Sequence, residues 1–134
     1  MTWKVEVLQE SFSAVNVKSA GYLVQAFRQW LNNNKLHKGF GRYGRLTIPK
    51  STDDVNLSRV HIFDDEKTAE FDQKRTPTFH RKSDAYLVYA INPNNPEHYL
   101  LLVVIDPKAH DKVNQINFVI TLIELAKKKF GITW

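Results

Sequence analysis

The chain lacks cysteine altogether, which excludes disulfide bonds, metal sites built on thiolates and catalysis by a cysteine nucleophile. The absence of disulfides is typical of proteins in a reducing compartment, so the expected location is the cytoplasm. The chain also lacks long apolar runs. None approaches the roughly 18 residues of a membrane-spanning helix, and residues 1–6 carry no apolar signal core. We therefore expect an unexported protein that does not bind a membrane.

Enough apolar residues are nevertheless present for a folded core. The 134 residues are 43% hydrophobic and 12% aromatic, a composition that excludes a disordered chain. The length suits a single domain, and the sequence shows neither an internal repeat nor a linker that would divide it. We therefore expect residues 1–134 to form one domain.

The charge balance favours an anionic partner. The chain carries a net charge of +5, and its pI is near 9.5. Half of the 14 acidic residues fall within residues 53–72, which leaves the flanking segments strongly positive. The flanking cations are Lys35, Lys38, Arg42, Arg45 and Lys50 on one side and Lys74, Arg75, Arg81 and Lys82 on the other. Clusters of this kind are typical of nucleic-acid contacts.

The N-terminal part predicts a strand followed by a helix. Trp3, Val5 and Val7 alternate with charged residues, as in a half-buried strand. Ser19 suits the N-cap of the helix, whose apolar pairs recur every four residues from Tyr22 to Leu31. Three asparagines, at 32–34, then predict its end.

The next two segments predict a loop and a short strand. Phe40–Arg45 combines two glycines with two arginines and a tyrosine, and we interpret it as a loop. Its spacing is not that of a phosphate-binding P-loop, so a nucleic-acid contact and a plain turn stay open as alternatives. Arg59–Phe63 has the composition of a strand. If Val60 and Ile62 face the core, His61 points outward.

The acidic segment 64–78 shows no periodicity, so it is expected to be irregular or partly helical. It opens with the consecutive carboxylates Asp64–Glu66. Carboxylates in such a polar run are usually solvated, and no further ligand stands at helical spacing beside them. We therefore expect no metal and no cofactor.

The segment that organises the chain is a predicted antiparallel hairpin. Ala85–Ile91 and Tyr99–Ile105 have the length and composition of strands, and the Pro/Asn turn Asn92–Pro96 can continue neither. An antiparallel pair would bring the cluster His80–Lys82, which enters the first strand, beside Lys108–His110, which leaves the second. Both sets of cations would then lie at the same end of the sheet.

A final helix is expected to pack on this sheet. Asp106 suits its N-cap with Pro107 in the first helical position, or Asp111 caps a helix that starts slightly later. Apolar residues then repeat at helical spacing from Ile116 to Phe130. If the helix begins before His110, one polar stripe forms from His110, Asn114, Asn117 and Thr121. This stripe could also be only the solvated border of an amphipathic helix.

Several motifs, spread over most of the chain, resemble those of the YafO-type toxins of bacterial toxin–antitoxin pairs. They are Phe40-Gly41-Arg42, Val60-His61-Ile62, Phe79-x-Arg81-x-x-Asp84-x-x-Leu87-Val88-Tyr89, Leu101 to Pro107, His110 and Asn117. The strand pair with its basic loop is also similar to the wider RelE-like superfamily of ribosome-dependent mRNA interferases. The order and spacing of the motifs carry this resemblance.

The resemblance implies an α+β, RelE-like fold: an N-terminal strand and helix, a mostly antiparallel sheet, and a C-terminal helix packed on the sheet. It also implies an mRNA endonuclease that enters the ribosomal A site, and a cognate antitoxin that holds the enzyme inactive. Catalytic residues differ among members of the superfamily, so no complete set is carried over to this chain.

Cleavage without a metal requires a base to activate the RNA 2′-hydroxyl, cations to stabilise the phosphorane, and an acid for the leaving 5′-oxygen. His110 is the first candidate for the acid or base, because imidazole titrates near neutrality. Arg81 is the candidate for phosphate stabilisation, supported by Lys82 and Lys108. The alternative acids or bases are His80 and His61.

Other polar residues are candidates for binding RNA. Arg42 and Arg45 would contact the backbone of the message or of ribosomal RNA. Tyr86 could stack on a base or donate to a phosphate, although a core aromatic is equally consistent with its position. Asn114 and Asn117 could orient His110 or the RNA.

Two other classes of function stay open at this point. A toxin with a RelE-like fold can act on a protein such as DNA gyrase, in which case the acid/base and phosphate-binding residues would be missing. A non-catalytic basic module that binds nucleic acid is the second alternative.

Overall fold

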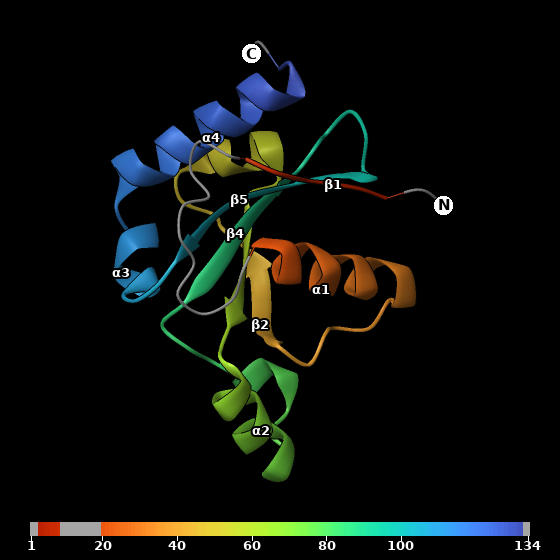
Figure 1. Ribbon diagram of the computed structural model, residues 1–134. Helices are drawn as coiled ribbons and strands as arrows, with labels where there is room; N and C mark the ends of the chain where they lie inside the picture. Colours follow the sequence, from red (N-terminus) through yellow and green to blue (C-terminus); the bar gives the residue numbers. More distant parts are fainter. Residues whose placement is uncertain (1–2, 9–19, 133–134) are drawn as a thin grey trace.

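The computed structural model describes residues 3–8 and 20–132, in which five strands form one mixed sheet in the order β1-β5-β4-β3-β2 (Figure 1). The strands are β1 (Lys4–Val7), β2 (Phe40–Arg45), β3 (Ser58–Ile62), β4 (Tyr86–Ile91) and β5 (His98–Ile105). The helices are α1 (Ala20–Asn33), α2 (Asp65–Gln73), α3 (Ala109–Val113) and α4 (Ile116–Phe130), with short 3-10 turns η1 (Lys50–Val55) and η2 (Thr78–His80). The expected α+β class is confirmed.

The predicted hairpin is the centre of the sheet. β4 and β5 pair antiparallel, with Tyr86 opposite Ile105 at one end and Ile91 opposite Tyr99 at the other. The side chain of Asn92 closes the turn by accepting the N–H of Asn94 at 2.9 Å. The predicted first strand, β1, adds to the outer edge of β5 in parallel, so the sheet is mixed. Its antiparallel pairs are β2·β3, β3·β4 and β4·β5.

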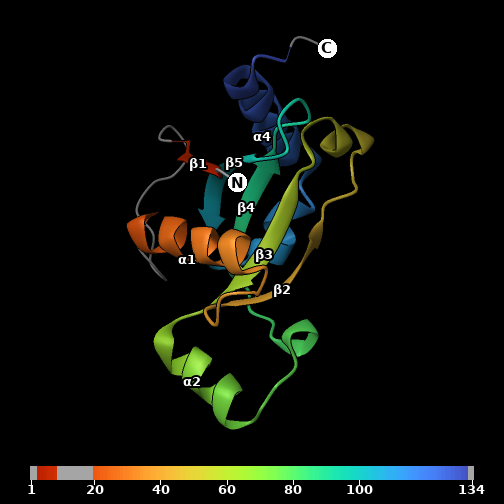
Figure 2. The same cartoon turned by 90° about the vertical axis from the view of Figure 1, so that its right-hand side faces the viewer.

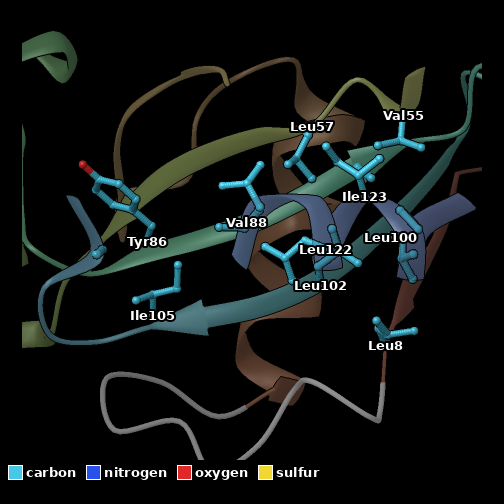
Figure 3. Packing of buried hydrophobic residues seen from close by; sticks show 14 of the residues in the cluster. Leu8, Val55, Leu57, Tyr86, Val88, Leu100, Leu102, Ile105, Leu122 and Ile123 are labelled. Carbon is cyan, nitrogen blue, oxygen red and sulfur yellow. The ribbon is translucent and has the colours of Figure 1, made fainter. Parts of the chain in front are cut away.

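Helices cover both faces of the sheet. In Figures 1 and 2, α1 lies across one face and α4 across the other. Because side chains alternate along a strand, β4 sends Leu87 and Tyr89 into the cluster beneath α1, and Tyr86 and Val88 into the cluster beneath α4. Figure 3 shows the second cluster, with Ile123 of α4 against the sheet. The predicted packing of the last helix on the sheet is confirmed.

The expectation that His61 points outward is wrong, because its ring packs against Tyr86 and bonds to the backbone of Ser83. Val60 and Ile62 do face the core under α1, as expected. The opposite face of β3 is buried as well, so His61 is only 6% exposed. A strand that is buried on both faces does not show the inward and outward alternation on which the outward placement of His61 depended.

Phe40–Arg45 is a strand, not the predicted loop. It pairs antiparallel with β3 at the edge of the sheet, with a bulge between Phe40 and Tyr43. Gly41 is needed for a close approach instead of a turn, because a Cβ at this position would overlap the carbonyl oxygen of Arg81. That carbonyl accepts the N–H of Arg42 at 2.9 Å, which joins β2 to the segment before β4.

Replacing Gly41 by Ala is expected to lower the free energy of unfolding by about 2 kcal/mol, since the added Cβ must displace backbone. Chemical denaturation measures the change. Gly44→Ala is the matched control, because its nearest contact would be a flexible guanidinium nitrogen of Arg59 at 3.4 Å. Equal stability of the two variants would contradict the proposed role of this close approach.

The predicted single C-terminal helix is interrupted. α3 ends with Asn114 as its C-cap, and α4 begins after Gln115. Neither Asp106 nor Asp111 is the N-cap of α3, whose N-cap is Lys108 in a left-handed conformation with φ of 62°. The proposed polar stripe is therefore divided, because His110 lies on α3 whereas Asn117 and Thr121 lie on α4. A continuous stripe would need one helix.

The acidic segment is partly helical, as expected. Asp64 caps α2 by accepting the N–H of Lys67 at 2.8 Å, and the helix extends beyond the end of the sheet (Figure 1). The predicted N-cap Ser19 lies outside the described residues. Among the described helices, none combines the length and the apolar character needed to cross a membrane.

Candidate functional site

A cavity of about 200 Å³ lies where the end of β2, β3, the start of β4 and α3 come together. The residues that line it are Arg45, Arg59, Tyr86, His110 and Asn114, together with Leu46, Thr47, Ile48 and Val113. Four of the predicted site residues, Arg45, Tyr86, His110 and Asn114, thus meet around one space. Arg59 was not predicted as a site residue.

Asp84 holds the backbone that carries His110. Its carboxylate accepts the N–H of Lys108 at 2.7 Å and that of His110 at 3.4 Å, and its carbonyl oxygen accepts the N–H of Ala109 at 3.1 Å. These bonds replace an N-cap side chain at the start of α3, since Lys108 supplies none. They also confirm that the segments entering β4 and leaving β5 meet at the same end of the sheet.

Tyr86 and Arg59 lie side by side on the face of the sheet that α4 covers. The guanidinium carbon of Arg59 is 5.4 Å from the centre of the Tyr86 ring, a cation–π contact. Tyr86 is only 4% exposed, and Figure 3 shows its phenolic oxygen pointing away from the aliphatic side chains of the cluster. The sequence left open whether Tyr86 is a core aromatic or a binding residue. In the structure its ring belongs to the core, and it also lines the cavity.

Arg59 could have been found from strand register. It stands opposite Val88 in the β3·β4 pair and so shares a face with the neighbouring pair of His61 and Tyr86. A cation on that face must lie beside the aromatic residues. The sequence alone did not give the pairing partner of β3, and this is why Arg59 was missed.

His61 does not line the cavity but packs against Tyr86, which does. The two rings meet edge to face with centroids 4.6 Å apart. Nδ1 of His61 accepts the backbone N–H of Ser83 at 2.8 Å. Burial, followed by the nearby charges of Arg59, Arg42 and Lys82, lowers the pKa of His61 to about 4. The carbonyl oxygen of Ser83, 2.9 Å from Nδ1, acts in the opposite direction. The imidazole is therefore neutral near pH 7, which suits a supporting residue.

The lowered pKa of His61 predicts a loss of stability in mild acid. An unfolded histidine takes up a proton near its ordinary pKa of 6.5, whereas the folded one does so only near 4. The contribution of neutral His61 to the free energy of unfolding is therefore complete above pH 6.5. It is lost as the pH falls from 6.5 towards 4, by at most about 1.4 kcal/mol per pH unit. Urea denaturation of the wild type and of His61→Gln at several pH values measures it. Parallel curves for the two proteins would refute the assignment.

The side chain of Arg81 contacts α2 and the residues that follow it. Its Nε donates to the carbonyl oxygen of Thr76 at 2.7 Å, and a terminal nitrogen lies 3.3 Å from a carboxylate oxygen of Asp72. The guanidinium also sits 5.8 Å from the ring centre of Phe71, and the side chain is 16% exposed. These contacts engage the guanidinium within the chain, so Arg59 and Arg45 become stronger candidates than Arg81 for binding a phosphate.

Within residues 3–8 and 20–132, the side chain of Arg45 forms an ion pair at the surface. Its guanidinium lies 2.9 Å from a carboxylate oxygen of Asp53, with the two side chains 44% and 62% exposed. Exposed pairs of this kind contribute little, typically about 0–1 kcal/mol. Arg45 can therefore exchange Asp53 for a phosphate at small cost.

The other predicted binding and catalytic residues do not line this cavity. Arg42 stacks on Phe79, 4.4 Å from the ring centre, and Phe79 is 61% exposed. Lys82 lines a neighbouring cavity together with Asp84. Lys82 is exposed, as are His80 on η2, Lys108 before α3 and Asn117 on α4. Within the described part of the chain, no group of three or more His, Asp or Glu residues could hold a metal ion.

The comparisons with known proteins agree with the resemblance in the sequence motifs. A family model described as "Toxin YafO, type II toxin-antitoxin system" matches residues 28–131, well over half of the chain. This range includes every residue that lines the cavity and the residues Asp84 and His61 that support it. No curated protein and no solved structure matches the chain.

Proposed function

The chain belongs to the YafO family of toxins of type II toxin–antitoxin systems, and from this premise we propose that it is a ribosome-dependent endoribonuclease that cuts translated mRNA. Membership of the family implies a cognate antitoxin as partner. The observation that carries the proposal is the cavity in which His110, Tyr86, Arg59 and Arg45 meet. This set provides a proton-transfer group, a hydroxyl and two cations. Cleavage of a phosphodiester needs groups of these kinds to move protons and to stabilise negative charge.

The reaction begins with the RNA itself. The 2′-hydroxyl next to the scissile phosphate attacks phosphorus and gives its proton to a base. The bond from phosphorus to the 5′-oxygen breaks, and an acid gives that oxygen a proton, so the proton count is balanced. The products are a 2′,3′-cyclic phosphate and a 5′-hydroxyl. No water or metal enters this step, so the protein has only to move protons and stabilise the added negative charge.

His110 transfers a proton and the arginines stabilise the phosphorane. His110 is placed at the cavity by the bonds of Asp84 to the start of α3. Arg59 offers a planar fork of donors that matches phosphate oxygens, and its contact with Tyr86 limits its orientation. Arg45 joins it once it leaves Asp53. Tyr86 donates its hydroxyl to a phosphate oxygen, and Asn114 contacts RNA or orients His110.

The surrounding residues bind RNA without taking part in proton transfer. Arg42 with Phe79 presents a cation and an exposed ring, which suits a nucleobase or a phosphate. Lys108, Lys82, His80 and Asn117 extend the polar surface around the cavity. A cavity of about 200 Å³ suits one phosphodiester group, so the ribosome must hold the rest of the message in the A site.

The proposal is tested by incubating the purified protein with an mRNA, with and without translating ribosomes, and mapping 5′ ends by primer extension. We expect cuts within the coding region only when ribosomes translate it, and no effect of EDTA at levels that leave ribosomes intact. If the protein cut mRNA in the absence of ribosomes, ribosome dependence would be refuted. Arrest of growth with intact mRNA would refute nuclease activity and direct attention to a protein target such as DNA gyrase.

A further inference from the structure

A second cavity, of about 470 Å³, lies on the face of the sheet that α1 covers. Its walls include Trp3 before β1, Trp30 and Leu31 of α1, and Tyr89 and Tyr99 of the central hairpin. Burial raises the pKa of both tyrosines, so the phenols stay neutral. A cavity of this size, walled by aromatic and aliphatic side chains, fits a bulky apolar group.

The walls of this aromatic cavity are braced by contacts between distant parts of the chain. Trp3 and Tyr99 meet with ring centroids 6.0 Å apart, and Arg28 of α1 donates to the carbonyl oxygen of Trp3 at 3.2 Å. Trp30 contacts Tyr43 of β2, with centroids 4.9 Å apart. Because β1, α1 and the hairpin hold one another, the cavity is formed before anything binds, which lowers the entropic cost of binding.

The aromatic cavity is separated from the catalytic cavity by the sheet. Tyr89 belongs to the cluster beneath α1, whereas Tyr86 belongs to the cluster beneath α4. Figure 2 shows α1 on its own side of the strands, away from α4. A ligand of the aromatic cavity therefore does not need to contact His110 or Arg59.

Positive charge lies beside the aromatic cavity. A smaller cavity of about 300 Å³ adjoins the end of α1, and Lys35 and Lys38 line it. The two cavities are adjacent, because their lining residues alternate along the chain. Leu31 and Asn34 line the aromatic cavity, whereas Asn33 and Lys35 line the smaller one. The sequence contains no acidic residue from 11 to 52, so this region attracts a partner that carries negative charge next to an apolar anchor.

We propose that the cognate antitoxin docks here: a bulky apolar side chain of an acidic, amphipathic segment enters the aromatic cavity, and its carboxylates lie beside Lys35 and Lys38. This inference rests on membership of the toxin family and not on the nuclease activity proposed above. It places an anchor of the inhibitor on the face opposite the catalytic cavity. Apolar and aromatic anchors of this type commonly provide most of the binding energy at an interface.

Isothermal titration of the purified antitoxin into this protein tests the proposal. Leu31→Glu, which puts a carboxylate at the aromatic cavity, is expected to weaken binding about 100-fold, and the Lys35→Glu/Lys38→Glu double variant about 10-fold. Leu31→Lys should weaken binding less than Leu31→Glu, because its charge attracts the acidic segment. Ile120→Glu is the matched control, since it makes the same chemical change at a residue of α4 that is 39% exposed.

Tryptophan emission provides a direct signal. In a Trp134→Phe background the remaining indoles are Trp3 and Trp30, both of which line the aromatic cavity. Their emission should shift when the antitoxin is added. Without antitoxin, the Leu31→Glu variant should cleave mRNA at the wild-type rate. Wild-type affinity for both Leu31→Glu and the double lysine variant would overturn the proposal. So would equal weakening by Ile120→Glu, or a dimer of this chain that Leu31→Glu dissociates.

Discussion

His110→Ala is expected to lower the rate of ribosome-dependent mRNA cleavage by about 100-fold or more, the range that loss of a general acid or base produces. The imidazole is exposed, and the bonds that fix the start of α3 come from its backbone and from Asp84. Removing the side chain therefore leaves the fold intact. Single-turnover cleavage in a purified translation system measures the rate, and thermal denaturation checks the stability.

His80→Ala provides the matched control for His110. His80 is also an exposed histidine near the same end of the sheet, but it lies on η2. We expect it to change the cleavage rate by less than about tenfold, the loss of a contact to the RNA backbone. If His80→Ala abolished cleavage and His110→Ala did not, the proton-transfer group would lie on the α2 side of the site and the proposed cavity would be wrong.

Arg59→Ala is expected to reduce cleavage by about 100-fold, because a preorganised donor to the phosphorane contributes this much in other enzymes. Arg59→Lys should restore only part of the rate, since an ammonium group keeps the charge but not the planar fork. Loss of the contact between Arg59 and Tyr86 is expected to lower stability slightly, and the melting temperature of both variants measures this change. A lower cleavage rate at an unchanged melting temperature would support a role of Arg59 in stabilising the phosphorane.

Comparison with Arg81→Ala decides between two assignments of the phosphate-binding cation. The sequence pointed to Arg81, whose guanidinium instead contacts Thr76 and Asp72 in the structure. We expect Arg81→Ala to destabilise the α2 region and to retain more cleavage activity than Arg59→Ala. Hydrogen exchange in 65–76 reports the first effect. A folded Arg81→Ala protein with the larger loss of rate would return the role to Arg81.

The sequence by itself determined the central hairpin, the amphipathic helices and the toxin family. Strand composition and the Pro/Asn turn are local signals, and they were sufficient to pair β4 with β5 and to place Lys108 and His110 beside the entry to β4. The motifs that resemble the toxin family gave the same assignment as the family match over residues 28–131.

Only the tertiary structure decided which cations belong to the cavity. Phe40–Arg45 contains two glycines and looks like a loop, yet pairing with β3 makes it a strand, and its end brings Arg45 to the cavity. Arg59 reaches the cavity through register with β4, and His61 is buried against Tyr86 and the backbone of Ser83. The start of α3 is fixed by Asp84, more than twenty residues earlier in the chain. Such contacts depend on which segments become neighbours in space, and local periodicity carries no information about that.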